Sequence, residues 1–237
     1  MITLEIACNS FTSCLHAAQG GAQRIELFEN LSEGGCTPSY GMIKQVKEKI
    51  KLPIYVMIRA RGGNFVYSDN ELEIMIHDVM ICRELGVNGI VFGALHENGS
   101  VNEEACRHIL KAWNHGPATF HRAIDASDNL ITAAGTIIDL GFERILTSGG
   151  KSTAWEGMTA IAAMQNKYGH RIEIQAGSGI TAENAAAIVA KTEVRSVHAT
   201  CKMNIAEIAS SQSITINPTQ VTSLEKVMEL RKVLDLI

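Results

Sequence analysis

The chain has 237 residues, of which 46% are hydrophobic and 19% charged, a composition typical of a folded globular protein. Its formal charge of -4 offers no basic field for nucleic acid or for an anionic membrane surface. No apolar run approaches the roughly 18 residues that span a bilayer, and the first residues lack the basic and apolar regions of a signal peptide. We therefore expect a cytoplasmic protein that binds neither nucleic acid nor a membrane.

Eight short β-rich runs alternate with helical patterns along the chain. Successive runs begin 20 to 35 residues apart. This spacing suits a repeated strand, loop and helix unit, because parallel neighbours need a crossover of a dozen or more residues between them. The runs begin near Leu4, Arg24, Ile54, Gly89, Ala118, Arg144, Ile172 and Ser196.

The segments between these runs carry helical composition and capping signals. Gly86, Gly141 and Gly169 follow predicted helices, where a left-handed C-cap belongs. Asp69 or Asn70 is the predicted N-cap of one helix, and Thr181 that of another. Helices are predicted over Phe11–Ala18, Tyr40–Ile50, Asn70–Leu85, Glu103–Trp113, Leu130–Leu140, Ala154–Tyr168, Ala182–Ala190 and Ser223–Leu236.

The last predicted helix follows an irregular, serine-rich stretch at 209–219. Helical spacing places one stripe of its side chains against the rest of the molecule. The stripe consists of Leu224, Val227, Met228, Arg231 and Leu234.

Strict alternation of eight strands with helices predicts an α/β protein, a closed eight-stranded parallel (β/α)8 TIM barrel with outer helices. A doubly wound open sheet is the alternative. No long linker or shift in composition divides the chain, so we expect a single domain over residues 1–237.

The alternation of side chains along each strand predicts which of them enter the barrel. One face of every strand packs on the helices and is expected to be apolar, while the other face fills the interior or builds a site. On the third run, this rule puts Tyr55, Met57, Arg59 and Arg61 on one face. Polar groups on the inward face of other strands are Glu5, Asn9, Arg24, Glu26, Thr119, His121, Asp125, Glu173, Gln175, Ser196, His198 and Thr200.

Two arginines and two glycine turns at strand exits predict an anion site. Arginine binds oxyanions with a planar fork, and glycine lets backbone N–H groups approach an anion closely. The second turn is expected to lead directly into the helix predicted to begin near Thr181. The candidate anion-binding residues are Arg59, Arg61, Ser148, Gly149, Gly150, Gly177, Ser178 and Gly179.

The inward acids and histidines suggest acid–base chemistry on a small phosphorylated or carboxylated substrate. Glu26 or Glu5 would be the general base, His121 oriented by Asp125 the acid, and His198 an assisting group. Isomerisation, aldol chemistry and hydrolysis all fit these groups. Two alternatives stay open, a divalent metal ion held by the same glutamates and histidines, and a purely structural layer of ion pairs.

The six cysteines contain no C-x-x-C pair, and in a cytoplasmic protein they are expected to be reduced thiols. Cys14, Cys82 and Cys106 fall within helical patterns, and we expect them to be small apolar residues of the core. Cys36 lies in the loop after the second run, where its thiol is a candidate to overlook the cavity.

Several ordered motifs make the chain similar to the CutC family of copper homeostasis proteins. They run from Arg24-Ile25-Glu26-Leu27 and Leu31-Ser32-Glu33-Gly34-Gly35, through Met57-Ile58-Arg59-Ala60-Arg61-Gly62-Gly63-Asn64-Phe65, to Thr119-Phe120-His121-Arg122-Ala123 and Arg144-Ile145-Leu146-Thr147-Ser148-Gly149-Gly150. The resemblance implies a cytosolic TIM barrel, a homodimer or higher homo-oligomer, and a role in copper handling, with Cu(I) as the bound ion.

The chain departs from that family at positions that bear on copper. Some members have cysteines, proposed as Cu(I) ligands, where this chain has Ala7 and Phe28. Cu(I) prefers soft thiolate or thioether ligands, and alternation turns Cys8 toward the helix layer. Met57, Cys36 and Cys201 are the remaining candidates. Ala60 also replaces the proline that is frequent between the two arginines.

Overall fold

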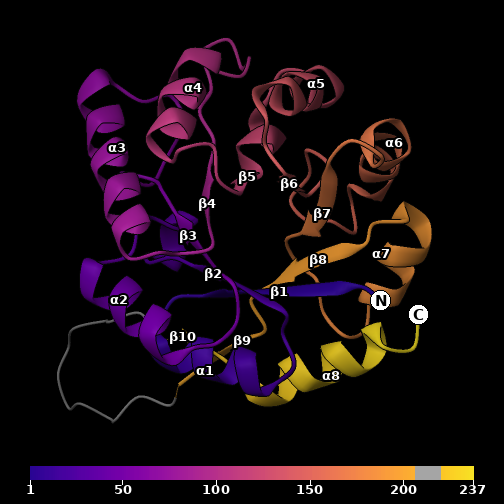
Figure 1. The fold of residues 1–237 in the computed structure, drawn as a ribbon. Helices are drawn as coiled ribbons and strands as arrows, with labels where there is room; N and C mark the ends of the chain where they lie inside the picture. The colour runs from indigo at the N-terminus through magenta and orange to yellow at the C-terminus, as the bar shows by residue number, and fades with distance from the viewer. Residues whose placement is uncertain (206–219) are drawn as a thin grey trace, which may run out of the picture.

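The structure, a computed structural model, describes residues 1–205 and 220–237. Eight parallel strands pair in chain order and close into a barrel, which confirms the predicted TIM barrel (Figure 1). The strands are β1 (Thr3–Cys8), β2 (Arg24–Leu27), β3 (Ile54–Met57), β4 (Gly89–Phe92), β5 (Ala118–Phe120), β6 (Arg144–Thr147), β7 (Glu173–Gly177) and β8 (Ser196–Ala199). The serine-rich stretch predicted at 209–219 lies outside the described residues.

Helices surround the barrel, each following a strand (Figure 1). Short 3-10 turns, η1 (Leu31–Glu33) and η2 (Arg122–Ala126), follow β2 and β5. The α-helices are α1 (Phe11–Gln19), α2 (Tyr40–Lys49), α3 (Asp69–Glu84), α4 (Glu103–Ala112), α5 (Leu130–Leu140), α6 (Met158–Tyr168), α7 (Ala185–Thr192) and α8 (Leu224–Leu234).

Two helices begin later than predicted, because turns take up the residues before them. Before α6, Thr153 and Glu156 cap a turn that ends at Gly157, where an added Cβ would lie 1.8 Å from the Ser148 carbonyl oxygen. Before α7, the Asn184 side chain accepts a hydrogen bond from the Thr181 backbone N–H. The prediction that the second glycine turn leads directly into a helix was therefore wrong.

Helix ends confirm part of the capping prediction. Gly86 and Gly141 have φ of 65° and 92°, in the left-handed region, whereas Gly169 has φ of -61°. Ser68, one residue before the predicted cap, starts α3 by forming a capping box with Glu71.

The alternation of side chains along the strands is confirmed. Outward side chains such as Leu4, Ile6 and Cys8 join one apolar core with the helices, and all three are 0% exposed. Inward side chains form a second, smaller cluster inside the barrel. That cluster consists of Ala7, Phe28, Tyr55, Met57 and Val91.

The C-terminal part of the chain returns to the barrel. An antiparallel pair that the sequence did not predict, β9 (Lys202–Asn204) and β10 (Gln220–Thr222), leads into α8 beside α1 and α7. Helix α8 buries Val227, Leu230 and Leu234, but the predicted stripe residue Met228 is 55% exposed. Among the described residues, no helix is both long and apolar enough to cross a membrane.

Candidate functional site

A cavity of about 1250 Å³ opens over the carboxyl ends of the strands. Its wall comes from the loops that follow β2, β3, β5, β6, β7 and β8, together with α8. This is the face of a (β/α)8 barrel on which enzymes of this fold carry their chemistry.

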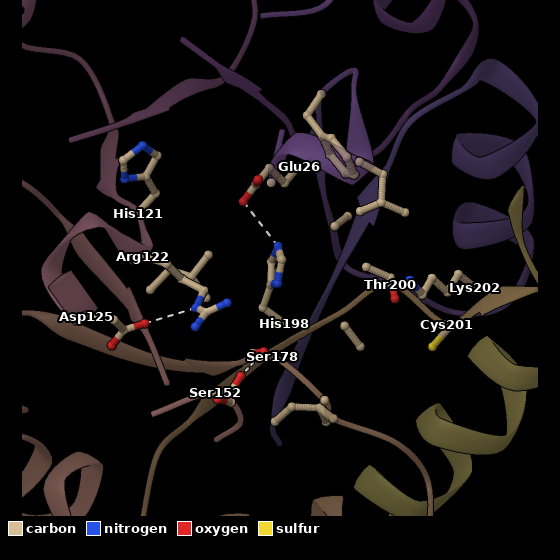
Figure 2. Close-up of a pocket in the computed structure, with 18 of the residues that line it drawn as sticks. Glu26, His121, Arg122, Asp125, Ser152, Ser178, His198, Thr200, Cys201 and Lys202 are labelled. Carbon is tan, nitrogen blue, oxygen red and sulfur yellow. Dashed lines mark hydrogen bonds and ion pairs between the residues drawn. The ribbon is translucent and has the colours of Figure 1, made fainter. Parts of the chain in front are cut away.

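The floor of the cavity holds a carboxylate and an imidazole from two strands that flank β1. Glu26 on β2 lies level with Ala7 of β1, and His198 on β8 lies level with Glu5. The His198 Nε2 atom lies 3.1 Å from the Glu26 Oε2 atom, and the two side chains point toward each other in Figure 2. Alternation on adjacent strands thus brings Glu5, Glu26 and His198 together, as the sequence predicted.

Burial alone would lower the pKa of His198, because the charged ring is desolvated, but the neighbouring carboxylates of Glu26 and Glu5 outweigh it and raise that pKa. Burial likewise opposes ionisation of Glu5, whose pKa is nevertheless lowered by Arg24, His198 and Arg144. The floor of the cavity therefore favours a charged carboxylate beside an imidazole.

Below this pair, a layer of ion pairs crosses the barrel interior. Arg24 pairs with Glu5 and, at 3.0 Å, with Glu173, which also pairs with Arg144 at 2.9 Å. The Tyr55 ring stacks against both guanidiniums, and its centroid lies 5.5 Å from the Arg24 Cζ atom and 4.8 Å from the Arg144 Cζ atom. The structural layer that the sequence left open as an alternative is present, and it lies beneath the cavity floor.

His121 lines the cavity but stands apart from the trio. Its ring packs on Phe65, with 4.9 Å between centroids, and its Nδ1 atom accepts a hydrogen bond from the Ala123 N–H. Burial, reinforced by Arg59, lowers the pKa of His121 to about 3. The ring is therefore neutral near pH 7 and is poorly suited to the role of general acid.

Asp125 does not orient His121. Its carboxylate accepts hydrogen bonds from the Thr147 hydroxyl, the Ser148 N–H and hydroxyl, and the Gly150 N–H, and it pairs with Arg122. The expected anion cradle after β6 is thus filled by a carboxylate of the chain itself, and Figure 2 shows its pairing with Arg122. The prediction that Asp125 orients His121 was wrong, because the glycine turn and Arg122 provide the partners of this carboxylate.

The two arginines of the β3 exit have other partners. Arg59 is buried and donates to the carbonyl oxygens of Glu33, Gly35 and Gly63, so it ties the loops after β2 and β3 together at the cavity wall. Arg61 pairs with Glu71 and does not line the cavity. Both guanidiniums are therefore engaged by groups of the chain itself.

The second glycine turn lies at the cavity wall. Ser178 has φ of 78° and Gly179 φ of 70°, and the Ser178 hydroxyl donates to the Ser152 carbonyl oxygen, as Figure 2 shows. Gly177 has a packing role, since a Cβ there would lie 2.5 Å from Leu146 and 3.4 Å from the His198 Nδ1 atom. Of the predicted anion-binding residues, Arg59, Gly150, Ser178 and Gly179 line the cavity, and Arg61, Ser148, Gly149 and Gly177 do not.

Four cationic side chains line the cavity that the sequence did not single out. Arg122 directly follows His121, and that adjacency was the one signal available from the sequence. The other three come from the loop after β6, from β9 and from α8, which only the folded chain brings together. The four are Arg122, Lys151, Lys202 and Lys226.

The cysteines lie mostly in the apolar layers. Cys8, Cys14, Cys82 and Cys106 are buried, and Cys36 is half-buried in the loop after β2, away from the cavity lining. Cys201 is half-buried and lines the cavity. The expectation that Cys36 overlooks the cavity was wrong.

Fold and site together define a TIM barrel whose candidate site lies at the carboxyl ends of its strands and carries an acid–imidazole pair on its floor. The model of the CutC family matches residues 2–203, and this chain belongs to that family. The matched range ends before β10 and α8, so Lys226 lies outside it.

Relatives and a solved structure agree with this assignment. The chain is 41% identical over 199 residues to a copper homeostasis protein cutC homolog of Homo sapiens, covering 84% of this chain and 73% of the relative. It is 43% identical over 203 residues to a family protein CutC of Xanthomonas campestris pv. campestris, covering 86% and 85%. The crystal structure of the putative copper homeostasis protein CutC from Streptococcus agalactiae superposes with a TM-score of 0.80 at 37% identity, covering 84% of this chain and 99% of that one.

Proposed function

We propose that this chain serves in copper homeostasis, the role named for its human and streptococcal relatives. We further propose that it acts through a ligand held in the barrel cavity and not as a thiolate carrier of Cu(I). The observation that carries this proposal is the Glu26–His198 pair on the floor of a large cavity with a cationic wall.

The donors that face the cavity do not fit Cu(I), which prefers thiolate and thioether ligands. Among the described residues, the cavity lining contains two sulfur atoms, those of Met57 and Cys201, while Ala7 and Phe28 provide none. Burial raises the pKa of Cys201 to about 11, which disfavours its thiolate. Cys8 and Cys14 lie beside each other, but both are 0% exposed on the helix side of β1.

Complementation tests this proposal. A host lacking the gene is grown over a range of copper concentrations while producing either the wild-type chain, Glu26→Gln or Cys201→Ser. We expect the wild-type and Cys201→Ser chains to restore copper tolerance and Glu26→Gln to fail, at equal protein levels. The reverse order, with Cys201→Ser inactive and Glu26→Gln active, would assign the role to the thiol.

Anaerobic Cu(I) titration against a chromogenic chelator provides an independent check on the purified chain. We expect no stoichiometric Cu(I) binding that depends on Cys201. If the wild-type chain binds one Cu(I) tightly and Cys201→Ser does not, the cavity contains a Cu(I) site and the proposal is wrong.

A second candidate function is catalysis on a small anionic substrate, and the four cations at the cavity wall favour it. Lys226 donates to the Lys202 carbonyl oxygen at 3.0 Å, so α8 and β9 place ammonium groups on one side of the opening. Arg122 and Lys151 approach from the loops after β5 and β6. In this function Glu26 and His198 would pass a proton to and from the substrate, while the cations hold its phosphate or carboxylate.

Thermal unfolding in the presence of inorganic phosphate tests the anion site. A ligand that binds the folded state raises the melting temperature. We expect phosphate to raise it for the wild-type chain and for Lys49→Met, an exposed lysine of α2, but not for a Lys151→Met, Lys226→Met double variant. An equal rise in all three proteins would assign the effect to general salt stabilisation.

A further inference from the structure

We propose that Glu5, Glu26 and His198 form a binding site for a divalent first-row transition-metal ion, with an open position toward the cavity. The site is distinct in chemistry from a Cu(I) site, because its donors are two carboxylates and one imidazole. Such ligands suit Zn²⁺ and Mn²⁺.

The potential ligand atoms of the three side chains already lie close to the separations that ligands have around a bound metal ion. One ligand atom from each lies within 4.8 Å of the other two. The His198 Nε2 atom is 3.1 Å from Glu26 Oε2 and 3.9 Å from Glu5 Oε1. Ligand atoms around a tetrahedral zinc ion at about 2.1 Å lie roughly 3.4 Å apart, so small side-chain shifts complete the geometry.

An unpartnered oxygen points into this site. Glu5 is 1% exposed, and its Oε1 atom has no hydrogen-bond partner among the described residues. A buried carboxylate oxygen without a partner costs about 1–3 kcal/mol or more, so a native chain rarely keeps one without a use. A metal ion between Glu5, Glu26 and His198 supplies that partner.

The charges inside the barrel also favour a cation. Glu5, Glu26 and Glu173 bring three carboxylates, whereas Arg24 and Arg144 bring two guanidiniums, and His198 adds no charge as a neutral metal ligand. Glu173 is partly open to solvent, but Glu5 and Glu26 are 1% and 3% exposed; Arg24 pairs with Glu5, whereas Glu26 faces His198. A bound divalent ion balances this pair of buried carboxylates.

Neighbouring residues hold the ligands in place, as they do around known metal sites. Arg24 engages the Oε2 atom of Glu5 and thereby turns Oε1 toward His198. Arg24 is itself anchored by Ser196 at 3.2 Å. Gly177 leaves room beside the His198 ring, because its missing Cβ would lie 3.3 Å from the His198 Cβ.

The cavity gives the site an entrance and an open face. Glu26 and His198 both line the cavity, while Glu5 lies below them in the layer of ion pairs. Three protein ligands with a free fourth position are typical of catalytic zinc sites, in which water or substrate takes that position. Structural zinc sites, in contrast, are closed by four protein ligands.

Calorimetric titration of the full chain with Zn²⁺, after removal of metals by a chelator, tests the proposal. We expect one Zn²⁺ per chain, and at least a tenfold weaker affinity in Glu26→Gln and in His198→Gln. Glu183→Gln, which removes an exposed carboxylate of the same cavity wall, should bind like the wild type. Cys201→Ser should also bind like the wild type.

Co²⁺ in place of Zn²⁺ identifies the ligands even if a variant fails to fold. Oxygen and nitrogen ligands give d–d absorption bands without the thiolate charge-transfer band that a cysteine ligand produces. Absence of Zn²⁺ binding to the wild-type chain overturns the proposal. So does a thiolate band, or an affinity that falls in Cys201→Ser and not in the Glu26 and His198 variants. The copper-tolerance test above is independent of these outcomes.

Discussion

His121 shows at the residue scale how burial decides what a side chain can do. The ring sits between Phe65 and Phe120, with centroids 4.9 Å and 6.2 Å away, and its pKa falls to about 3 because the charged form is desolvated. In the unfolded chain the same ring protonates near its ordinary value of 6.5. The unfolded state therefore binds more protons between these two values, and stability falls as the pH is lowered through this window.

Replacing His121 by Phe should remove this dependence. Between pH 6.5 and pH 5, we expect the wild-type chain to lose about 1.5 kcal/mol more in free energy of unfolding than His121→Phe does. Denaturant unfolding at the two pH values measures the difference. His108→Gln, at an exposed position of α4, should follow the wild type. Parallel pH profiles for wild type and His121→Phe would show that the ring is protonated in the folded chain.

Asp125 is the residue on which the turn after β6 depends. Its carboxylate receives hydrogen bonds from two backbone N–H groups and two hydroxyls, and its side chain is 8% exposed. An amide cannot accept at both positions, so we expect Asp125→Asn to lower the free energy of unfolding by about 2–4 kcal/mol. Asp128 is an exposed residue of the loop after β5, the loop that also carries Asp125. Asp128→Asn should change the free energy of unfolding by less than about 0.5 kcal/mol. Equal losses in the two variants would contradict this role.

At the scale of elements, β4 contributes space to the barrel. Gly89 lies opposite Tyr55 of β3, and a Cβ at Gly89 would be 2.2 Å from the Tyr55 Cε1 atom. The absent side chain lets one aromatic ring fill the interior between two arginines. A small residue on one strand thus compensates for a large one on its neighbour.

Adding a methyl group at Gly89 should therefore destabilise the barrel. We expect Gly89→Ala to lower the free energy of unfolding by about 1–3 kcal/mol, because the Tyr55 ring must leave its position. Gly41→Ala, in α2 with nothing within 4 Å of the added Cβ, should raise it by about 0.4–1 kcal/mol. Denaturant unfolding measures the change in the free energy of unfolding for both variants. A change of the same sign in both would contradict this packing argument.

At the scale of the whole molecule, the layer of ion pairs joins opposite parts of the barrel. Arg144 on β6 bonds Thr119 of β5 at 2.6 Å and Glu173 of β7 at 2.9 Å, and Glu173 in turn bonds Arg24 of β2. Burial opposes the charge on Glu173, but the two arginines lower its pKa. The strands are thereby held by charges as well as by the backbone ladder.

A double-mutant cycle measures this contribution. Arg144→Met and Glu173→Gln should each lower the free energy of unfolding by about 2–3 kcal/mol, and together by at least 1 kcal/mol less than their sum. The exposed pair of Arg171 and Asp139, at 3.2 Å, is the matched control and should couple by less than about 1 kcal/mol. Coupling of equal size in the two pairs would mean that burial adds nothing to the barrel pair.

The sequence predicted the barrel and the inward positions well, because both depend on local periodicity. Alternation alone placed Glu5, Glu26 and His198 on one interior, and strand order then made them neighbours. The prediction from sequence failed where the partners of a side chain come from loops. Asp125 accepts hydrogen bonds from the glycine turn after β6, and Arg59 donates to three carbonyl groups. Lys226 joined the cavity from a helix whose path no local pattern describes.

The turn after β6 binds a carboxylate of the same chain, that of Asp125 in η2, and this determines how the turn responds to anions in solution. Because Asp125 is tethered, its carboxylate is present at the glycine N–H groups at a high effective concentration, which dilute phosphate or carboxylate cannot match. The loop is therefore ordered by the chain itself, whatever the supply of metabolites. A glycine turn of the kind that binds phosphate in other proteins is occupied here by Asp125, which leaves Lys151, Lys202 and Lys226 at the cavity wall to contact an anion that enters.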